Sequence, residues 1–157
     1  MAQPTTRREN TSRTTVLTAA GVDELRPGVY VFGDAQQLEL GTCGLDDIAL
    51  TAVATVVSRR GVRAVLDAGS KVLGADQPPW ISGGGRLLHY PDARIIALSE
   101  HHATVQFAAG YGTPDLGEKV RVVPNHVCTA VNLADNLVID DGERLTRWPV
   151  AARGANA

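Results

Sequence analysis

The sequence predicts an all-β fold, a small antiparallel β-barrel or sandwich. Many short, β-branched apolar runs recur along the chain at near-regular spacing. Glycine, proline and Asp-Gly turn signals separate them, and no helical pattern lasts longer than a turn or two. This combination is typical of all-β domains. The length of 157 residues and the hydrophobic content of 44% suit one domain with a sizeable core.

The N-terminal part divides into an arm and the start of the domain. Residues 1–22 are polar and rich in Thr and Arg, so we expect a disordered arm. The β-domain is expected to span residues 23–154, with residues 155–157 as a tail. Turn chemistry at residues 25–28 precedes residues 29–32, which have the composition of a first strand.

The rest of the chain is interpreted as strands and tight connections. Residues 49–58 contain enough alanine for a helix, yet their valines and threonines favour a strand. A strand over 63–67, a tight connection over 68–71 and a Pro/Gly-rich loop over 77–85 follow. An Asp-Gly pair predicts a hairpin turn over 140–143. The other expected strands are 86–90, 93–98, 102–107, 119–123, 127–133, 136–139 and 144–150.

Charge and composition argue against several classes of function. A formal net charge of −2 and an aromatic content of 4% do not suit nucleic-acid binding, and no apolar run reaches the length of a membrane helix. No apolar signal segment follows Met1, so we expect a cytoplasmic protein. The two cysteines, Cys43 and Cys128, do not form a disulfide framework, although one bridge between them would be possible.

The segment around His126 and Cys128 carries the clearest chemical signal. Within a predicted strand, residues two apart point to the same face, with Cα atoms about 6–7 Å apart. An imidazole and a thiolate at that spacing can meet on one zinc ion and make half of a site. The alternative is structural, because cysteine is often a small buried hydrophobe and a lone histidine is usually a satisfied polar residue.

Six motifs together resemble the C-terminal domain of the D-serine dehydratase/D-threonine aldolase family, from about residue 23 to about residue 154. In this chain they are LRPGVYVFGD at 25–34, LDAGSK at 66–71, YPDA at 90–93, LSE at 98–100, VVPNHVC at 122–128 and WPVAARG at 148–154.

The resemblance implies a fold-type III enzyme that is similar to alanine racemase. In such an enzyme an N-terminal α/β-barrel carries pyridoxal phosphate on a lysine, and the β-domain carries a divalent metal beside the substrate β-hydroxyl. The family motif P-x-H-x-C/D makes His126 and Cys128 the implied metal ligands, with zinc as the implied ion. Cysteine at the second position is more similar to the dehydratase branch than to the aldolase branch.

Two features depart from the family pattern. We expect no barrel before this domain, because a barrel needs about 200–250 residues, and neither Lys71 nor Lys119 suits the cofactor lysine. The family sequence S-E-E-H-G is replaced by Ser-Glu-His-His-Ala at 99–103. His102 falls on the family histidine and is a candidate catalytic residue, as a general base, a third ligand or a rim residue, whereas His101 is changed.

The sequence therefore predicts a metal-bearing domain of a D-amino-acid lyase that needs a separate pyridoxal phosphate barrel for activity. The alternatives are a non-catalytic metal-binding or interaction module and the remnant of a truncated gene. A face that normally meets a barrel would be exposed, so we expect an apolar or mixed patch beside His126 and self-association. We expect no nucleic-acid partner and no membrane partner.

Other polar and aromatic residues are assigned structural roles. Asp67, Ser70 and Lys71 are expected to hold a turn rather than to contact substrate, and the glycines at 83–85 are expected to form a hairpin loop. We expect His89 and His101 at the surface and Tyr30 and Trp148 in the core. Cys43 is expected to be a buried thiol.

Overall fold

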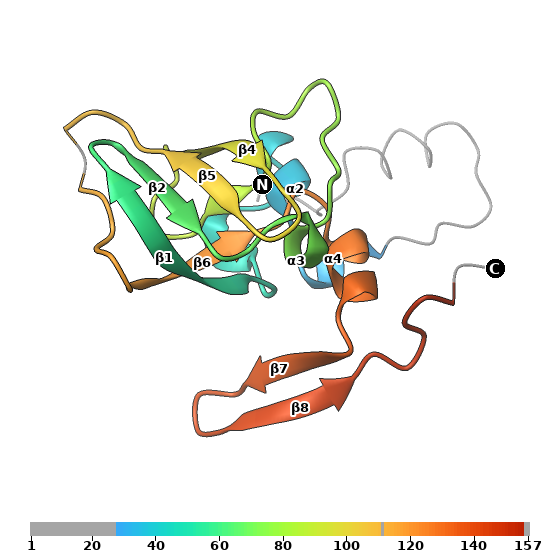
Figure 1. Cartoon of the computed structure of the whole chain (residues 1–157). Helices are drawn as coiled ribbons and strands as arrows, with labels where there is room; N and C mark the ends of the chain where they lie inside the picture. The colour runs from blue at the N-terminus through green and yellow to red at the C-terminus, as the bar shows by residue number, and fades with distance from the viewer. Residues whose placement is uncertain (1–27, 111, 156–157) are drawn as a thin grey trace, which may run out of the picture.

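The computed structural model describes residues 28–110 and 112–155. Its main body is a six-stranded antiparallel sheet in the order β3-β6-β1-β2-β5-β4 (Figure 1). The sheet curls until its two end strands approach each other, and the Gly84 N–H donates to the Ile95 carbonyl across that seam at 2.9 Å. The result is a nearly closed barrel, which confirms the predicted all-β class. The strands are β1 (Ala52–Arg60), β2 (Arg63–Leu66), β3 (Arg86–Leu87), β4 (Arg94–Leu98), β5 (Ala103–Gln106) and β6 (Lys119–Val123).

Strand β1 bends the sheet into this shape. Its first half pairs with β6 and its second half with β2, and the pairing register shifts between Val56 and Ser58. Such a bulge increases the local twist of a strand. Alternate side chains then point into the barrel, in accordance with the two-residue period of a strand. The interior is filled mainly by aliphatic side chains that are almost fully buried: Val56, Leu66, Leu87, Ile95, Val105 and Val122.

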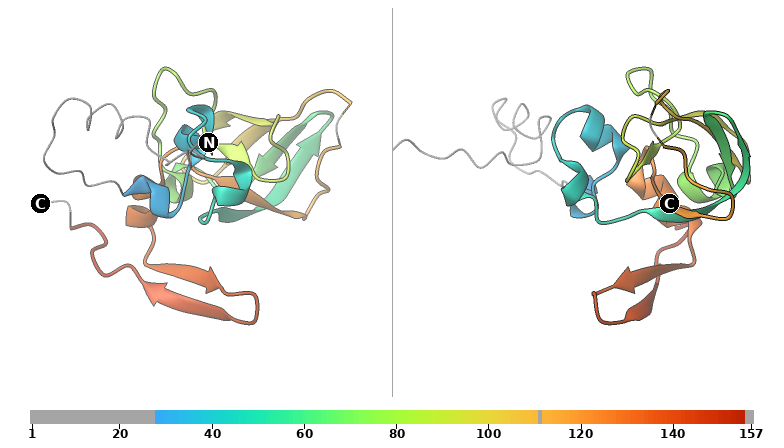
Figure 2. Two further views of the ribbon diagram at one scale, coloured as in Figure 1. Left: turned by 180° about the vertical axis from the view of Figure 1, so that it is seen from behind. Right: turned by 90° about the vertical axis from the view of Figure 1, so that its left-hand side faces the viewer.

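Three short helices gather at one end of the barrel (Figures 1 and 2). They are α2 (Ala35–Glu39), α3 (Ser70–Leu73) and α4 (Val127–Leu133), and 3₁₀ turns cover Val29–Val31 and Leu45–Asp47. Helix α3 packs against α4. Among the described residues no helix is long and apolar enough to cross a membrane.

A second, two-stranded sheet lies apart from the barrel. Strands β7 (Asn136–Asp140) and β8 (Leu145–Pro149) form a hairpin that follows α4 and is separated from the barrel (Figures 1 and 2). Its outgoing chain returns to α4, because the Gly154 N–H donates to Asn132 Oδ1 at 2.8 Å. The hairpin with its Asp-Gly turn confirms the sequence prediction, and Gly142 has the positive φ of 86° that the turn requires.

Several predicted elements are wrong. Residues 127–133 form helix α4 rather than a strand, and residues 29–32 form a 3₁₀ turn rather than a strand. The predicted connection at 68–71 contains the first residues of α3, and the predicted strand at 86–90 ends after Leu87, where a tight turn to Tyr90 begins. The expected arm at 1–22 and the turn chemistry at 25–27 lie outside the described residues.

Two aromatic residues are also placed differently from the prediction. Tyr30 and Trp148 are exposed rather than buried, with exposed fractions of 54% and 61%. Tyr30 lies in the first 3₁₀ turn and Trp148 in the hairpin, so neither belongs to the barrel. A β-branched or aromatic run predicts a strand or a buried segment only where another layer covers it.

Candidate metal centre

Asp34 is the buried residue that joins two of the helices. It is the N-cap of α2, where its Oδ1 accepts the Gln37 N–H at 2.9 Å. Its Oδ2 accepts the Val127 N–H at 3.1 Å, at the first residue of α4. One carboxylate therefore satisfies free N–H groups at the start of two helices. Its side chain is completely buried, and the backbone bonds compensate for its removal from water.

The imidazole of His126 lies beside the same carboxylate. Its Nδ1 is 3.4 Å from Asp34 Oδ2, and the side chain is 30% exposed. The hydrogen bond to Asp34 raises the pKa of His126 above its usual 6.5, against the opposing effect of burial. With Nδ1 turned toward Asp34, Nε2 is the ring nitrogen left for another ligand.

Cys128 is the second residue of α4 and is exposed as a free thiol. Partial burial of the Cys128 thiol raises its pKa, and the charges of Asp34 and Asp76 raise it further. The same two carboxylates act on His126, so both side chains lie in the electrostatic field of one acidic pair. A metal ion would displace a proton from this thiol, because the thiolate is the ligand.

The same-face argument for His126 and Cys128 needs correction, because it relied on a strand. His126 has extended backbone angles as the N-cap of α4, and the helix begins at the next residue. In a helix, residues two apart do not share a face. The two residues flank Val127 at the point where the extended chain becomes α4, and Asp34 contacts both His126 Nδ1 and the Val127 N–H there. Their role as metal ligands stays a prediction.

The loop before α4 is held firmly on both sides. Carbonyls of Pro124 and Asn125 accept the N–H groups of Ala35 and Gln36 at the start of α2, at 3.0 and 3.3 Å. The buried Asn125 amide donates to the carbonyls of Asp76 and Gly83 at 2.8 and 2.9 Å. These contacts bind the segment before His126 to α2 and to the 74–85 loop.

His102 lies on a different feature, the β4–β5 hairpin turn. Its side chain is exposed, and its backbone is bonded to Ser99 at both N–H and carbonyl. The 28–110 and 112–155 ranges contain no group of three His, Cys, Asp or Glu side chains that could hold an ion. The structure therefore does not bring His102 into one ligand set with His126 and Cys128, and its catalytic role stays a prediction.

The polar motif at 67–71 has a structural explanation. Asp67 Oδ1 accepts the Thr55 N–H at 2.6 Å, and Lys71 forms an exposed ion pair with Glu100 at 2.7 Å. At Gly69 an added Cβ would lie 2.3 Å from the Ser99 carbonyl oxygen, so the close approach of α3 to the β4–β5 turn requires glycine. This geometry agrees with the expectation of a turn rather than a substrate contact.

Cys43 lies in the loop after α2 and is half-buried with a free thiol. Burial raises its pKa, and the charges of Asp47 and Asp34 raise it further. Both cysteines are free thiols, so the disulfide considered from the sequence is not formed.

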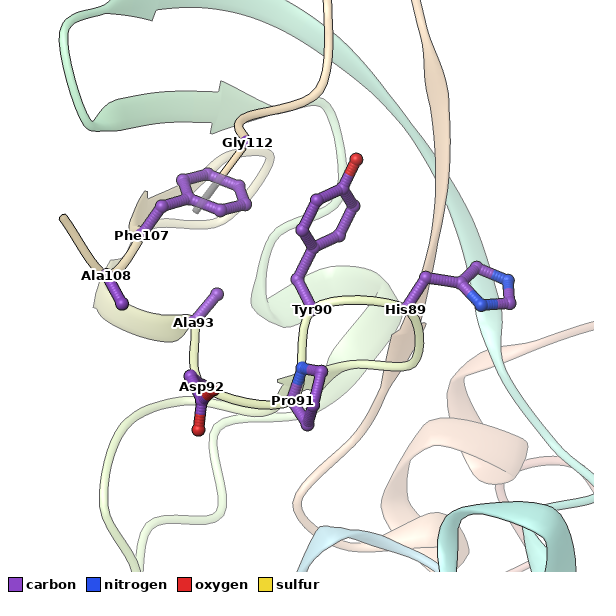
Figure 3. A pocket seen from close by; sticks show the side chains of 8 residues that line it. All are labelled: His89, Tyr90, Pro91, Asp92, Ala93, Phe107, Ala108 and Gly112. Carbon is purple, nitrogen blue, oxygen red and sulfur yellow. The ribbon is translucent and has the colours of Figure 1, made fainter. Parts of the chain in front are cut away.

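A separate apolar pocket lies between the turn that joins β3 to β4 and the segment that follows β5 (Figure 3). It has a volume of about 290 Å³. The rings of Tyr90 and Phe107 meet edge-to-face in its wall, with centroids 5.3 Å apart. His126, Cys128 and Asp34 do not line it, so it is not part of the candidate metal centre.

The residues at the junction fit a zinc ion by their chemistry. They offer one imidazole nitrogen and one thiol, which are ordinary zinc donors. Asp34 occupies the position of the outer carboxylate that commonly holds a metal-binding histidine. Two protein donors leave coordination positions for a substrate or water, as in catalytic rather than structural sites.

Comparison with known proteins places the chain in a family. Residues 49–139 match the family described as "Putative serine dehydratase domain". An uncharacterized protein of Mycobacterium tuberculosis is 54% identical over 132 residues, which cover 80% of this chain and 99% of that protein. The D-serine dehydratase of Dictyostelium discoideum is 33% identical over 144 residues, which cover 83% of this chain but 36% of that enzyme.

Solved structures show the same relation. The D-threonine aldolase of Filomicrobium marinum superposes with a TM-score of 0.70 and 35% identity, over 86% of this chain and 37% of that enzyme. The D-threo-3-hydroxyaspartate dehydratase of Delftia sp. HT23 gives a TM-score of 0.66 and 26% identity, over 82% and 39%. Structures of D-threo-3-hydroxyaspartate dehydratase also include a cysteine-to-alanine mutant in the metal-free form and a histidine-to-alanine mutant, at positions two residues apart.

The chain thus spans well under half the length of the enzymes that it matches, and nearly the whole length of the mycobacterial protein. The family match over 49–139 covers all six strands of the barrel and all of α4. The chain belongs to the serine dehydratase domain family, and it is homologous to the C-terminal domain of D-amino-acid lyases.

Proposed function

We propose that this domain binds zinc through His126 and Cys128 and serves as the metal-bearing part of a D-amino-acid lyase. The observation that carries the proposal is the junction itself, where an imidazole beside a buried carboxylate is followed two residues later by an exposed thiol. The related dehydratase with histidine and cysteine mutants at the same spacing, one of them metal-free, supports this assignment.

Each residue has a defined part in this proposal. His126 presents Nε2 and Cys128 presents its sulfur. When bound, zinc supplies Lewis acidity toward a substrate hydroxyl, which would assist loss of that hydroxyl or of its proton. His102, from the β4–β5 turn, is the candidate general base or rim residue.

The pyridoxal phosphate cofactor is proposed to come from a partner barrel. In such enzymes the cofactor acts as an electron sink, and the relatives contain a large region that this chain does not match. Exposed apolar side chains near the junction support a docking face there: Tyr30 and Val31 shortly before Asp34, Val72 on α3 and Leu133 on α4. The same exposed side chains make self-association an expected property of the isolated domain.

A specific observation favours a second function, a non-catalytic metal-binding module. The mycobacterial relative is matched over 99% of its length, so in that protein the domain stands almost alone. This alternative shares the zinc site and differs in predicting no lyase activity with any barrel.

Zinc content tests the shared part of both functions. Purified wild type is compared with the double variant His126→Ala, Cys128→Ala after zinc loading and dialysis. The matched control is His89→Ala, Cys43→Ala, which removes an exposed histidine and the other cysteine. We expect zinc in the wild type and the control but not in the double variant. Equal zinc content in all three would exclude the site.

Activity separates the two functions. The domain is mixed with barrel proteins encoded by the same genome, and ammonia or aldehyde release from D-serine and D-threonine is measured. Activity that depends on His126 and on the added barrel supports the lyase. Zinc binding without activity or association in any pairing supports the non-catalytic module.

A further inference from the structure

We propose that Asp34 is a positioning residue that presets the imidazole of His126 for the metal. This inference rests on the proposed zinc site and concerns a residue outside the matched segment 49–139. Asp34 precedes His126 by 92 residues, so the fold rather than the local sequence brings them together.

Contacts other than the one with His126 fix the position of the Asp34 carboxylate. Two backbone N–H groups, from Gln37 and Val127, bind its two oxygens at 2.9 and 3.1 Å. The 3.4 Å contact with His126 is longer than a usual hydrogen bond. The first turns of α2 and α4 therefore set the position of the carboxylate, and the carboxylate in turn orients the imidazole of His126.

The chemistry of the acceptor determines the tautomer. Oδ2 of Asp34 already acts as an acceptor toward the Val127 N–H, so a hydrogen bond to the same oxygen requires the proton on the Nδ1 that faces it. In the neutral ring the lone pair is then on Nε2, which is the nitrogen directed away from Asp34 and available to an ion. His126 follows Asn125, whose amide holds the loop through two carbonyls, so the backbone of the histidine is also fixed.

One arrangement thus has two consequences. The same carboxylate that begins α2 and α4 also sets which nitrogen of His126 meets the metal. A partner of this kind typically contributes about 10- to 100-fold to metal affinity. A merely structural cap would not affect the tautomer of the ring.

The test uses Asp34→Asn, which keeps the shape of the side chain. If the amide oxygen stays on the Gln37 N–H, the amide NH₂ takes the place of Oδ2. It then loses the bond from the Val127 N–H, faces Nδ1 and moves the ring proton to Nε2. We expect nitrogen NMR of the metal-free protein to show the Nδ1–H form in the wild type and the Nε2–H form in the variant. We also expect zinc affinity to fall about 10- to 100-fold, measured with a chromophoric competitor.

Two further variants separate positioning from folding. Asp67→Asn is the matched control, because Asp67 also accepts a backbone N–H, that of Thr55 in barrel strand β1. We expect this variant to leave the zinc affinity and the tautomer of His126 unchanged. Asp34→Ser keeps an N-cap side chain for α2 and removes the partner of His126. If Asp34→Asn does not fold, Asp34→Ser should give the same loss of zinc affinity.

The outcomes are distinct for the two proposals. A wild type that binds no zinc overturns the proposed function. In that case the tautomer of the metal-free His126 ring still shows whether Asp34 orients the imidazole. Zinc binding by the wild type with unchanged affinity in both Asp34 variants overturns the positioning role alone. An Nε2–H ring in the metal-free wild type overturns it as well.

Discussion

The barrel and the β7–β8 hairpin are built from similar sequences but differ in what covers them. Val138 in β7 and Val105 in β5 each lie next to another β-branched residue in a short strand, yet their exposed fractions are 61% and 0%. The barrel closes on itself, whereas the hairpin forms a sheet of its own. A two-stranded ribbon is marginally stable in water. The comparison shows that a strand pattern predicts pairing but not burial.

The largest effect should come from truncating one leucine in each region. Leu66 in β2 is fully buried and Leu145 in β8 is 69% exposed. We expect Leu66→Ala to lower the free energy of unfolding by about 2–5 kcal/mol, and Leu145→Ala to change it by less than about 0.5 kcal/mol. Urea unfolding followed by circular dichroism measures both.

A large loss of stability in Leu145→Ala would contradict this difference. It would mean that the hairpin is covered in solution, and repeating the measurement at several protein concentrations would show whether a second copy covers it.

A smaller effect should appear as separate unfolding of the two regions. Trp80→Phe leaves Trp148 as the sole tryptophan, because the chain contains two. We expect Trp148 fluorescence to change at lower urea than the circular dichroism of the barrel, because the hairpin has few tertiary contacts and opens locally. The variant Trp148→Phe, which leaves Trp80 in the 77–85 loop, is the control. Coincident transitions for Trp148 and the barrel would contradict independent opening.

The smallest effect concerns acid pH at the hairpin turn. The Arg144 N–H, followed by the Glu143 N–H, holds the pKa of Asp141 below its ordinary 3.8. Because the pKa is lower in the folded turn, this stabilisation is complete above the unfolded value and disappears as pH falls through the folded one. We expect NMR shifts of β7 and β8 to show fraying at the acid end of this range. Asp141→Asn should remove that dependence, and a hairpin with equal acid response in both proteins would refute it.

The sequence predicted the barrel better than it predicted the site. The β6 bounds were predicted correctly, and β1 lies mostly within its predicted range, because β-branched residues and turn signals act locally. The prediction of a strand over residues 127–133 was wrong because Val127, Thr129 and Val131 are β-branched residues that favour a strand. A helix forms there because tertiary contacts, including the Asp34 bond to the Val127 N–H, override that preference.

The candidate ligands were found from the sequence, but their support was not. Asp34 follows the predicted strand at 29–32 and is not among the predicted site residues, although an aspartate followed by Ala-Gln-Gln-Leu-Glu has the signature of a helix N-cap. That signal predicts the bond to Gln37. It cannot predict the contact with His126, because that contact depends on how two distant segments pack.

The double attachment of Asp34 has a practical consequence for how this domain can be shortened. A chain trimmed to the family match would begin at residue 49 and end at residue 139, inside β7. It would keep His126 and Cys128 but lose the carboxylate that starts their helix, and it would expose the Val127 N–H and sever the hairpin. Recombinant fragments of such domains should therefore begin upstream of the 3₁₀ turn at Val29 and extend beyond Gly154, so that both ends remain attached to α4.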